Sequence, residues 1–98
     1  MIHVIDYLNA HLTDDITIDF LAEHFYLSRY HLMHAFKEET GYTIGNYLTT
    51  KRLLLARDQI AQGESITTAC YACGFHNYST FSRAYRKHFG CSPREQRN

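Results

Sequence analysis

Apolar residues recur along this chain at three- and four-residue steps, the spacing that places side chains on one face of an α-helix. Ile2, Ile5, Leu8 and Leu12 show this spacing first, and no segment follows the two-residue alternation of a strand. Over the whole chain the same criterion predicts helices at residues 2–12, 18–25, 29–40, 43–62, 66–73 and 78–89, so about seven helices or fewer in total. Gly90 and Pro93 are expected to stop the last of them. The predicted fold class is therefore all-α.

Residues suited to helix ends lie at these boundaries. Thr17, Ser28 and Ser65 precede predicted helices and can accept a hydrogen bond from a backbone N–H of the first turn. Gly41 and Gly90 follow predicted helices, where glycine readily takes the left-handed conformation that ends a helix. The short segments between the helices are therefore expected to be turns.

The pattern occurs twice, with matching positions 49 residues apart in the second copy. The first copy has Leu32, His34, Ala35, Phe36, Lys37 and Gly41, and the second has Phe81, Arg83, Ala84, Tyr85, Arg86 and Gly90. A small-residue helical stretch and a short break precede each strip, so each half predicts a helix-turn-helix unit. We expect a first lobe over residues 1–42, a linker helix over 43–62 and a second lobe over 63–98.

The two matching helices have an apolar arc and a polar, basic arc. The outer arc is predicted to carry Tyr30, Met33, His34 and Lys37 in the first copy and Ser79, Ser82, Arg83 and Arg86 in the second. Neither of these sets contains a carboxylate. We therefore expect both arcs to face the phosphates and base edges of double-stranded DNA.

Composition changes this picture only through the distribution of charge. The 98 residues have a net charge of zero, which is unusual for a nucleic-acid-binding chain. The N-terminal residues 1–28 contain no Lys or Arg, whereas residues 78–98 contain Arg83, Arg86, Lys87, Arg94 and Arg97 against Glu95 alone. The C-terminal lobe is therefore expected to supply most of the attraction to DNA.

Other sequence features bound the setting of the chain. No apolar run approaches the roughly 18 residues of a membrane span, and the first residues lack the order of a signal peptide. The three cysteines are an odd number, and without an export signal we expect them to be reduced thiols. These features predict a cytoplasmic protein with no membrane partner.

Cysteine and histidine chemistry is the main competing explanation. Cys70, Cys73 and His76 are spaced by two residues, which would suit a small zinc site. Both cysteines fall inside a predicted helix at positions that the repeat assigns to packing, so we expect core thiols and neither a metal ion nor another cofactor. A buried thiol is also a poor nucleophile, so we do not expect an enzyme.

Several motifs resemble one known family. The first half contains Ala22-x5-Ser28, Leu32-x3-Phe36-Lys37 and Gly41, and the second contains Gly74-Phe75, Phe81-x-Arg83-x-Tyr85 and Phe89-Gly90-x-Ser92-Pro93. Together they resemble the DNA-binding domain of the AraC/XylS family of bacterial transcription regulators. The resemblance implies two helix-turn-helix lobes joined by a helix, each inserting a recognition helix into the major groove, at blocks about one helical turn apart.

The expected site follows from the outer arcs and the resemblance. The base-reading candidates are Arg29, Tyr30, Met33, His34, His76, Asn77, Tyr78, Ser79, Ser82 and Arg83, and the phosphate-binding candidates are Lys37, Arg86 and Lys87. Arg83 is the foremost reader because its guanidinium can bind a guanine edge through two hydrogen bonds. Tyr78 could instead be a partly buried residue at the start of its helix.

The chain departs from the family at two informative positions. Tyr26 and Leu27 stand where a glycine followed by an aromatic residue is common, and His34 stands where the second copy has Arg83. The first lobe therefore has a less certain turn and a weaker cation.

Two other functions remain as alternatives, a helical protein-interaction module and a small metal-binding domain. RNA polymerase and an effector or dimerisation domain absent from this chain are further candidate partners.

Overall fold

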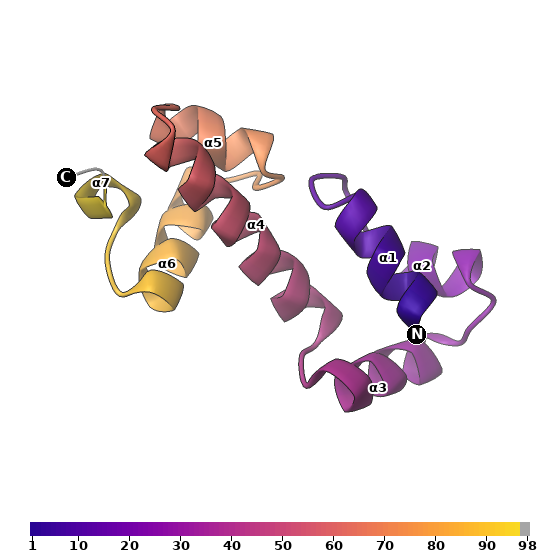
Figure 1. The fold of residues 1–98 in the computed structure, drawn as a ribbon. Helices are drawn as coiled ribbons and strands as arrows, with labels where there is room; N and C mark the ends of the chain where they lie inside the picture. Colours follow the sequence, from indigo (N-terminus) through magenta and orange to yellow (C-terminus); the bar gives the residue numbers. More distant parts are fainter. Residues whose placement is uncertain (97–98) are drawn as a thin grey trace. The chain divides into compact units, whose positions relative to one another are not determined.

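The computed structural model describes residues 1–96 and contains helices joined by short turns. The helices are α1 (Ile2–Ala10), α2 (Ile18–His24), α3 (Arg29–Thr40), α4 (Ile44–Ala61), α5 (Ile66–Ala72), α6 (Tyr78–Phe89) and α7 (Pro93–Gln96) (Figure 1). Over the described part of the chain there is no strand, which confirms the all-α class. Arg97, one of the basic residues counted above, lies outside the described residues.

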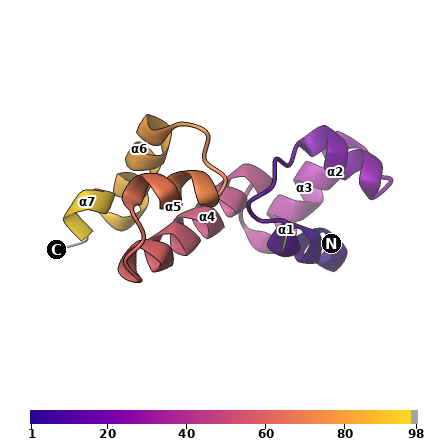
Figure 2. The same ribbon diagram turned by 90° about the horizontal axis from the view of Figure 1, so that it is seen from above.

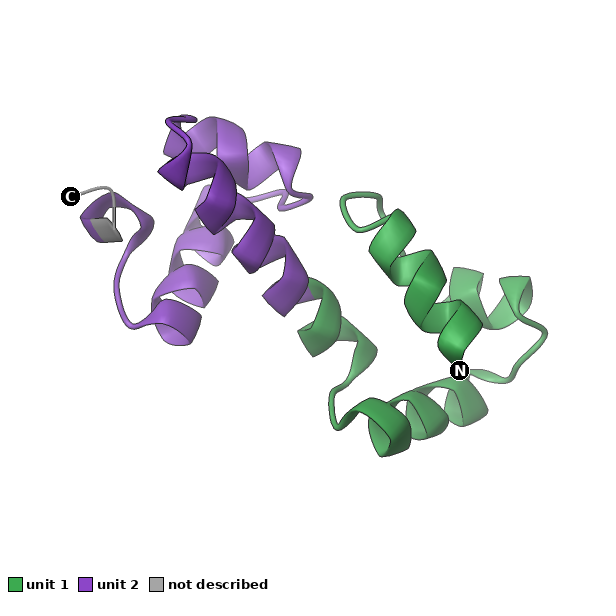
Figure 3. Ribbon diagram, viewed as in Figure 1, with its two compact units in different colours: residues 1–48 green, residues 49–98 purple. Residues whose placement is uncertain are grey.

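The chain divides into two compact units, Met1–Leu48 and Thr49–Asn98 (Figure 3). The division falls within α4, so this helix contributes its first turn to the first unit and the remainder to the second. Within the first unit α2 packs against α3, and within the second α5 packs against α6 and α6 against α7 (Figures 1 and 2). Each unit therefore contains one packed helix-turn-helix pair.

The first unit has its own hydrophobic core. Its buried residues are Val4, Leu8, Leu21, Ala22, Leu32, Phe36, Ile44 and Leu48. α1 contributes Val4 and Leu8, whereas Ile2 is 67% exposed and does not join the stripe proposed from the sequence. The inward stripe of this short helix thus follows a four-residue step from Val4 to Leu8.

The second unit is built around a separate core. Its buried residues are Leu53, Ala56, Ile60, Ala69, Cys70, Cys73, Phe81 and Tyr85. Cys70 and Cys73 are fully buried, as their predicted packing role requires. The long helix α4 therefore buries different residues in each unit.

α7 is a helix that the sequence analysis missed. Pro93, expected only to stop the preceding helix, is the first residue of α7, a position where its fixed φ and missing N–H do no harm. Ser92 accepts a hydrogen bond from the Glu95 N–H at 3.2 Å, and the Glu95 carboxylate accepts one from the Ser92 N–H at 3.0 Å. This reciprocal capping box begins the helix. None of the helices over residues 1–96 is both long enough and apolar enough to cross a bilayer.

Candidate nucleic-acid interface

The first helix-turn-helix is fixed by caps at both helix starts and by the backbone of its turn. The Thr17 hydroxyl accepts from the Phe20 N–H and the Ser28 hydroxyl accepts from the His31 N–H, each at 3.0 Å. In the turn, the Leu27 N–H donates to the Ala22 carbonyl at 2.8 Å. Of the two hydrogen bonds of a Schellman motif, this is the one that joins residues five apart in the sequence. The motif turns the chain sharply after α2.

Tyr26 is the residue that completes this turn. Its N–H donates to the Glu23 carbonyl at 3.3 Å, and its φ of 57° lies in the left-handed region. In the second unit the equivalent position is Gly74, with a φ of 99°. Tyr26 therefore takes the place that glycine has in the second turn. The turn geometry is the same, with the tyrosine in a backbone conformation that favours glycine.

The second helix-turn-helix repeats this construction. The Ser65 hydroxyl accepts from the Thr68 N–H at 3.1 Å, and the Asn77 side chain accepts from the Thr80 N–H at 3.0 Å, so these residues cap α5 and α6. The Phe75 N–H donates to the Cys70 carbonyl at 3.2 Å, completing a second Schellman motif. Asn77 is thus a helix cap, and its side-chain oxygen is already engaged.

The two turns differ in length by one residue. Leu27 is followed directly by the cap Ser28, whereas His76 lies between Phe75 and the cap Asn77. The repeat is therefore 48 residues before the turn, from Thr17 to Ser65, and 49 after it, from Ser28 to Asn77. The single spacing of 49 applies only to the second helix of each unit.

The outer face of α3 carries the predicted side chains. Tyr30 is 77% exposed and Met33 is 49% exposed, and His34 and Lys37 are also exposed. The Tyr30 ring stacks on the His34 imidazole with centroids 5.6 Å apart and planes 9° apart. The geometry of the face thus agrees with the helical wheel, while its DNA contacts remain a prediction.

Two carboxylates lie beside this face, contrary to the expectation of an acid-free arc. His34 Nε2 lies 3.4 Å from a Glu38 carboxylate oxygen, one helical turn further along α3. Arg29 Nε lies 3.1 Å from an Asp19 carboxylate oxygen on α2. Glu38 could have been found from its four-residue spacing to His34, whereas the Asp19 contact requires knowledge of how α2 packs on α3.

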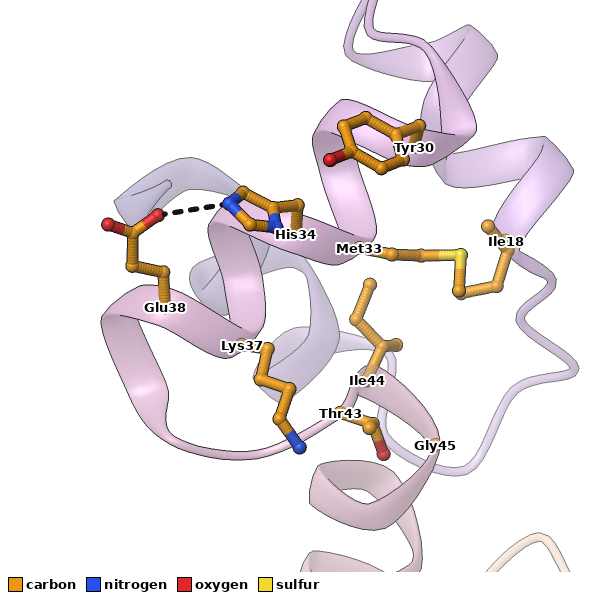
Figure 4. Close-up of a pocket in the computed structure, with 9 residues that line it drawn as sticks. All are labelled: Ile18, Tyr30, Met33, His34, Lys37, Glu38, Thr43, Ile44 and Gly45. Carbon is orange, nitrogen blue, oxygen red and sulfur yellow. Dashed lines mark ion pairs between the residues drawn. The ribbon is translucent and has the colours of Figure 1, made fainter.

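The same face borders an open groove of about 790 Å³ in the first unit, which we call the α3 groove (Figure 4). It is lined by Ile18, Tyr30, Met33, His34, Lys37, Glu38, Thr43, Ile44 and Gly45. Met33 and Ile18 line the groove from different helices, and in Figure 4 the Lys37 ammonium points toward the start of α4. The groove combines three separate segments, so spacing along α3 alone could not reveal it.

The outer face of α6 is more strongly basic. Ser79, Arg83, Arg86 and Lys87 are exposed, and Ser82 is partly exposed. Tyr78 is half-buried and packs against the second core, with its ring centroid 6.2 Å from that of Phe81. Tyr78 is therefore a partly buried residue at the start of α6, and its contact with DNA stays a prediction. His76 is exposed in the preceding turn.

Cys70 and Cys73 lie in the second core, whereas His76 is exposed. Burial raises the pKa of the Cys70 thiol, and burial together with the neighbouring Cys70 raises that of Cys73 to about 11. Both thiols are therefore protonated at neutral pH, which makes them weak ligands and nucleophiles. Among the described residues, no group of three or more His, Cys, Asp or Glu side chains could hold a metal ion.

Comparison with known proteins identifies the family. A helix-turn-helix domain family matches residues 21–98. A transcriptional regulator of Chromobacterium violaceum, described as having an AraC-type DNA-binding domain, is 33% identical over 96% of this chain and 85% of its own, with a TM-score of 0.84. The chain belongs to the AraC/XylS family.

Two further comparisons support this placement. The DNA-binding domain of AdpA, a global transcriptional factor solved with a target DNA, has a TM-score of 0.90 and 26% identity, covering 97% of this chain and 86% of that one. The transcriptional activator RhaS of Escherichia coli is 38% identical over 92 residues, which are 93% of this chain. The chain spans about a third of the length of the curated relatives it matches.

Proposed function

We propose that this chain is the sequence-specific DNA-binding part of a transcription regulator, with α3 and α6 as its recognition helices. The observation that carries the proposal is the duplicated helix-turn-helix, each copy with a capped second helix whose outer face is exposed. A helix of this kind fits the major groove of B-form DNA. Each unit would then read one block of the target site.

The side chains divide into two proposed roles. Phosphate contacts position a protein on DNA, and base contacts give specificity. Arg83 is the proposed guanine reader on α6, and Met33 and His34 are the corresponding readers on α3. Lys37, Arg86 and Lys87 are the proposed phosphate contacts, because they lie toward the ends of the two helices and carry flexible cations.

Arg29 and Asn77 hold weaker positions among the proposed readers. Arg29 already contacts Asp19, and the Asn77 side-chain oxygen caps α6. The remaining candidates are Tyr30, His76, Tyr78, Ser79 and Ser82. Tyr78 is the least accessible aromatic of this group, since it packs against the second core.

The proposal extends to two partners besides DNA. RhaS is named a transcriptional activator, and this chain matches about a third of it. RNA polymerase is the proposed partner through which bound protein affects transcription, and an effector or dimerisation domain is the proposed source of regulation. No catalytic role is part of the proposal.

Selection of bound duplexes from a random library tests the proposal directly. The purified chain should enrich one site with two conserved blocks, spaced about one helical turn apart. A copy of that site with about five extra base pairs between the blocks should bind more weakly, because the second block then faces the opposite side of the duplex.

Two results would contradict this proposal. Failure to enrich any sequence over the starting library, at moderate salt, would remove sequence-specific binding. Equal affinity for the site and for the copy with the insertion would leave DNA binding in place but remove simultaneous reading by two helices.

A further inference from the structure

We propose that the α3 groove reads the C5-methyl groups of thymine, with Met33 as the principal contact, so that the first unit selects a thymine-containing block. This inference rests on the proposed function and names the base chemistry that the first unit recognises. It assigns α3 a mode of reading different from that of α6.

The apolar lining of the groove is the first support. Met33 and the Tyr30 ring expose apolar surface on the outer face of α3. The partly buried Ile18 of α2 and the buried Ile44 of α4 also line the groove. In the major groove the thymine methyl group is the apolar feature that distinguishes one base from the others. Contact with Met33 would remove apolar surface of both partners from water, which is favourable.

Charge at the rim indicates how the groove meets DNA. Glu38 lies on one side and holds the His34 imidazole, while Lys37 lies among the same lining residues. A carboxylate is repelled by phosphates, so the side of the groove that carries Glu38 should face the base edges, while Lys37 reaches the phosphate proposed for it. Base edges carry no net charge and can approach both the carboxylate and the apolar floor.

Contacts among the rim side chains add to the selectivity. Tyr30 stacks on His34, and His34 is in turn held by Glu38. Side chains that are already ordered lose less conformational entropy on binding. Met33 stays adaptable beside them, and an unbranched thioether side chain fits closely around a methyl group.

α6 provides an internal comparison. Among its described residues none is both large and apolar and at the same time exposed, and its outer face offers Ser79, Arg83 and Arg86. These groups form hydrogen bonds and ion pairs, which do not depend on a thymine methyl group. Thymine-methyl recognition should therefore be confined to the block read by α3.

The test uses the duplex enriched in the selection and copies in which each thymine in turn is replaced by uracil. This replacement removes only the methyl group and leaves every hydrogen-bonding group of the base unchanged. At one or two thymines of one block, wild-type affinity should fall about fourfold, the factor expected for one methyl group buried from water. In the other block the replacement should have no effect.

Variants then assign the effect to the groove. Met33→Ala should bind the thymine and uracil duplexes equally, whereas Met33→Leu should keep most of the difference because its volume and apolarity are similar. Ile2→Ala is the matched control, since it removes exposed apolar surface of the same unit outside the groove. It should keep the full fourfold difference.

The outcomes separate the two proposals. The inference is overturned, with sequence-specific binding intact, if replacement of thymine by uracil changes the affinity at no position. It is also overturned if Met33→Ala keeps the wild-type difference between the thymine and uracil duplexes. The same holds if the block read by α3 contains no thymine and uracil weakens binding only in the block read by α6. If the wild-type chain enriches no sequence at all, the proposed function fails and the inference fails with it.

Discussion

Tyr26 holds a backbone conformation that tyrosine rarely adopts. Its φ is 57° and its side chain is 95% exposed, so little packing compensates for the steric strain of the left-handed region. Tyr26→Gly should raise the free energy of unfolding of the first unit by about 0.5 to 1 kcal/mol, because glycine adopts this region without strain. Urea denaturation followed by circular dichroism measures the change.

The control for this prediction is Tyr26→Ala. Alanine also lacks the exposed ring but keeps a Cβ atom, so it should not stabilise the unit. An equal gain for both variants would show that loss of the ring, and not relief of backbone strain, is responsible.

Glu38 lowers the positive potential beside the outer face of α3. Its carboxylate lies beside His34, on a face that the proposed function directs at DNA. Glu38→Gln should tighten binding to every duplex by about two- to fivefold, which corresponds to up to about 1 kcal/mol for removing one unfavourable charge in water. A gel-shift titration against the selected site and an unrelated duplex measures both affinities.

Glu39→Gln makes the same charge change on the next residue of α3, which is exposed but does not line the α3 groove. It should give a smaller gain than Glu38→Gln. Equal gains would mean that only the net charge of the helix matters, and unequal gains on the two duplexes would make Glu38 a base-contacting residue.

Arg83 and Arg86 lie on the same helix, α6, and have different proposed roles. Arg83→Ala should relax sequence preference at one or two base pairs and weaken the selected site by about 1 to 3 kcal/mol, as expected for a lost bidentate base contact. Arg86→Ala should weaken all duplexes about equally and reduce the slope of log affinity against log salt by about 0.9, the signature of one phosphate contact. Salt titrations on two duplexes distinguish these patterns, and the same pattern for both variants would contradict the division of roles.

The helices were largely predictable because their end signals are local. Thr17, Ser28 and Ser65 cap the helices that they were expected to cap, and α6 has the predicted bounds. α7 was missed because a proline was interpreted only as a stop, although Ser92 and Glu95 carry the spacing of a capping box. A local signal such as a proline thus shows that a helix boundary is near. It does not by itself show whether a helix starts or ends there.

The candidate site was predictable only in part. The exposed positions of α3 and α6 followed from helical period, since Met33 and Arg83 lie outside the arcs that bury Leu32 and Phe81. The groove and the Asp19 contact did not follow, because they join segments far apart in the chain whose packing no spacing rule describes. Which of the exposed residues touch DNA remains a prediction.

The molecule consists of two units with separate cores, and the repeat in the sequence predicted this duplication. What the repeat did not predict is how differently the two copies present their outer faces. α3 borders an apolar groove with an acid at its rim, whereas the described outer face of α6 is polar and basic. Similar backbones therefore carry different recognition chemistry.

The extra residue His76 limits how the recognition helices of the two units can be exchanged. Because both turns end in the same backbone motif and differ only afterwards, the two recognition helices are equivalent from their caps, Ser28 and Asn77, onward. An exchange of α3 and α6 should be spliced at these caps, so that each turn keeps its native length. A splice made inside the turn, with 48 residues as the offset between the copies throughout, would shift the transplanted helix by one residue. This shift rotates the helix by about 100° and turns its reading face away from the major groove of the DNA.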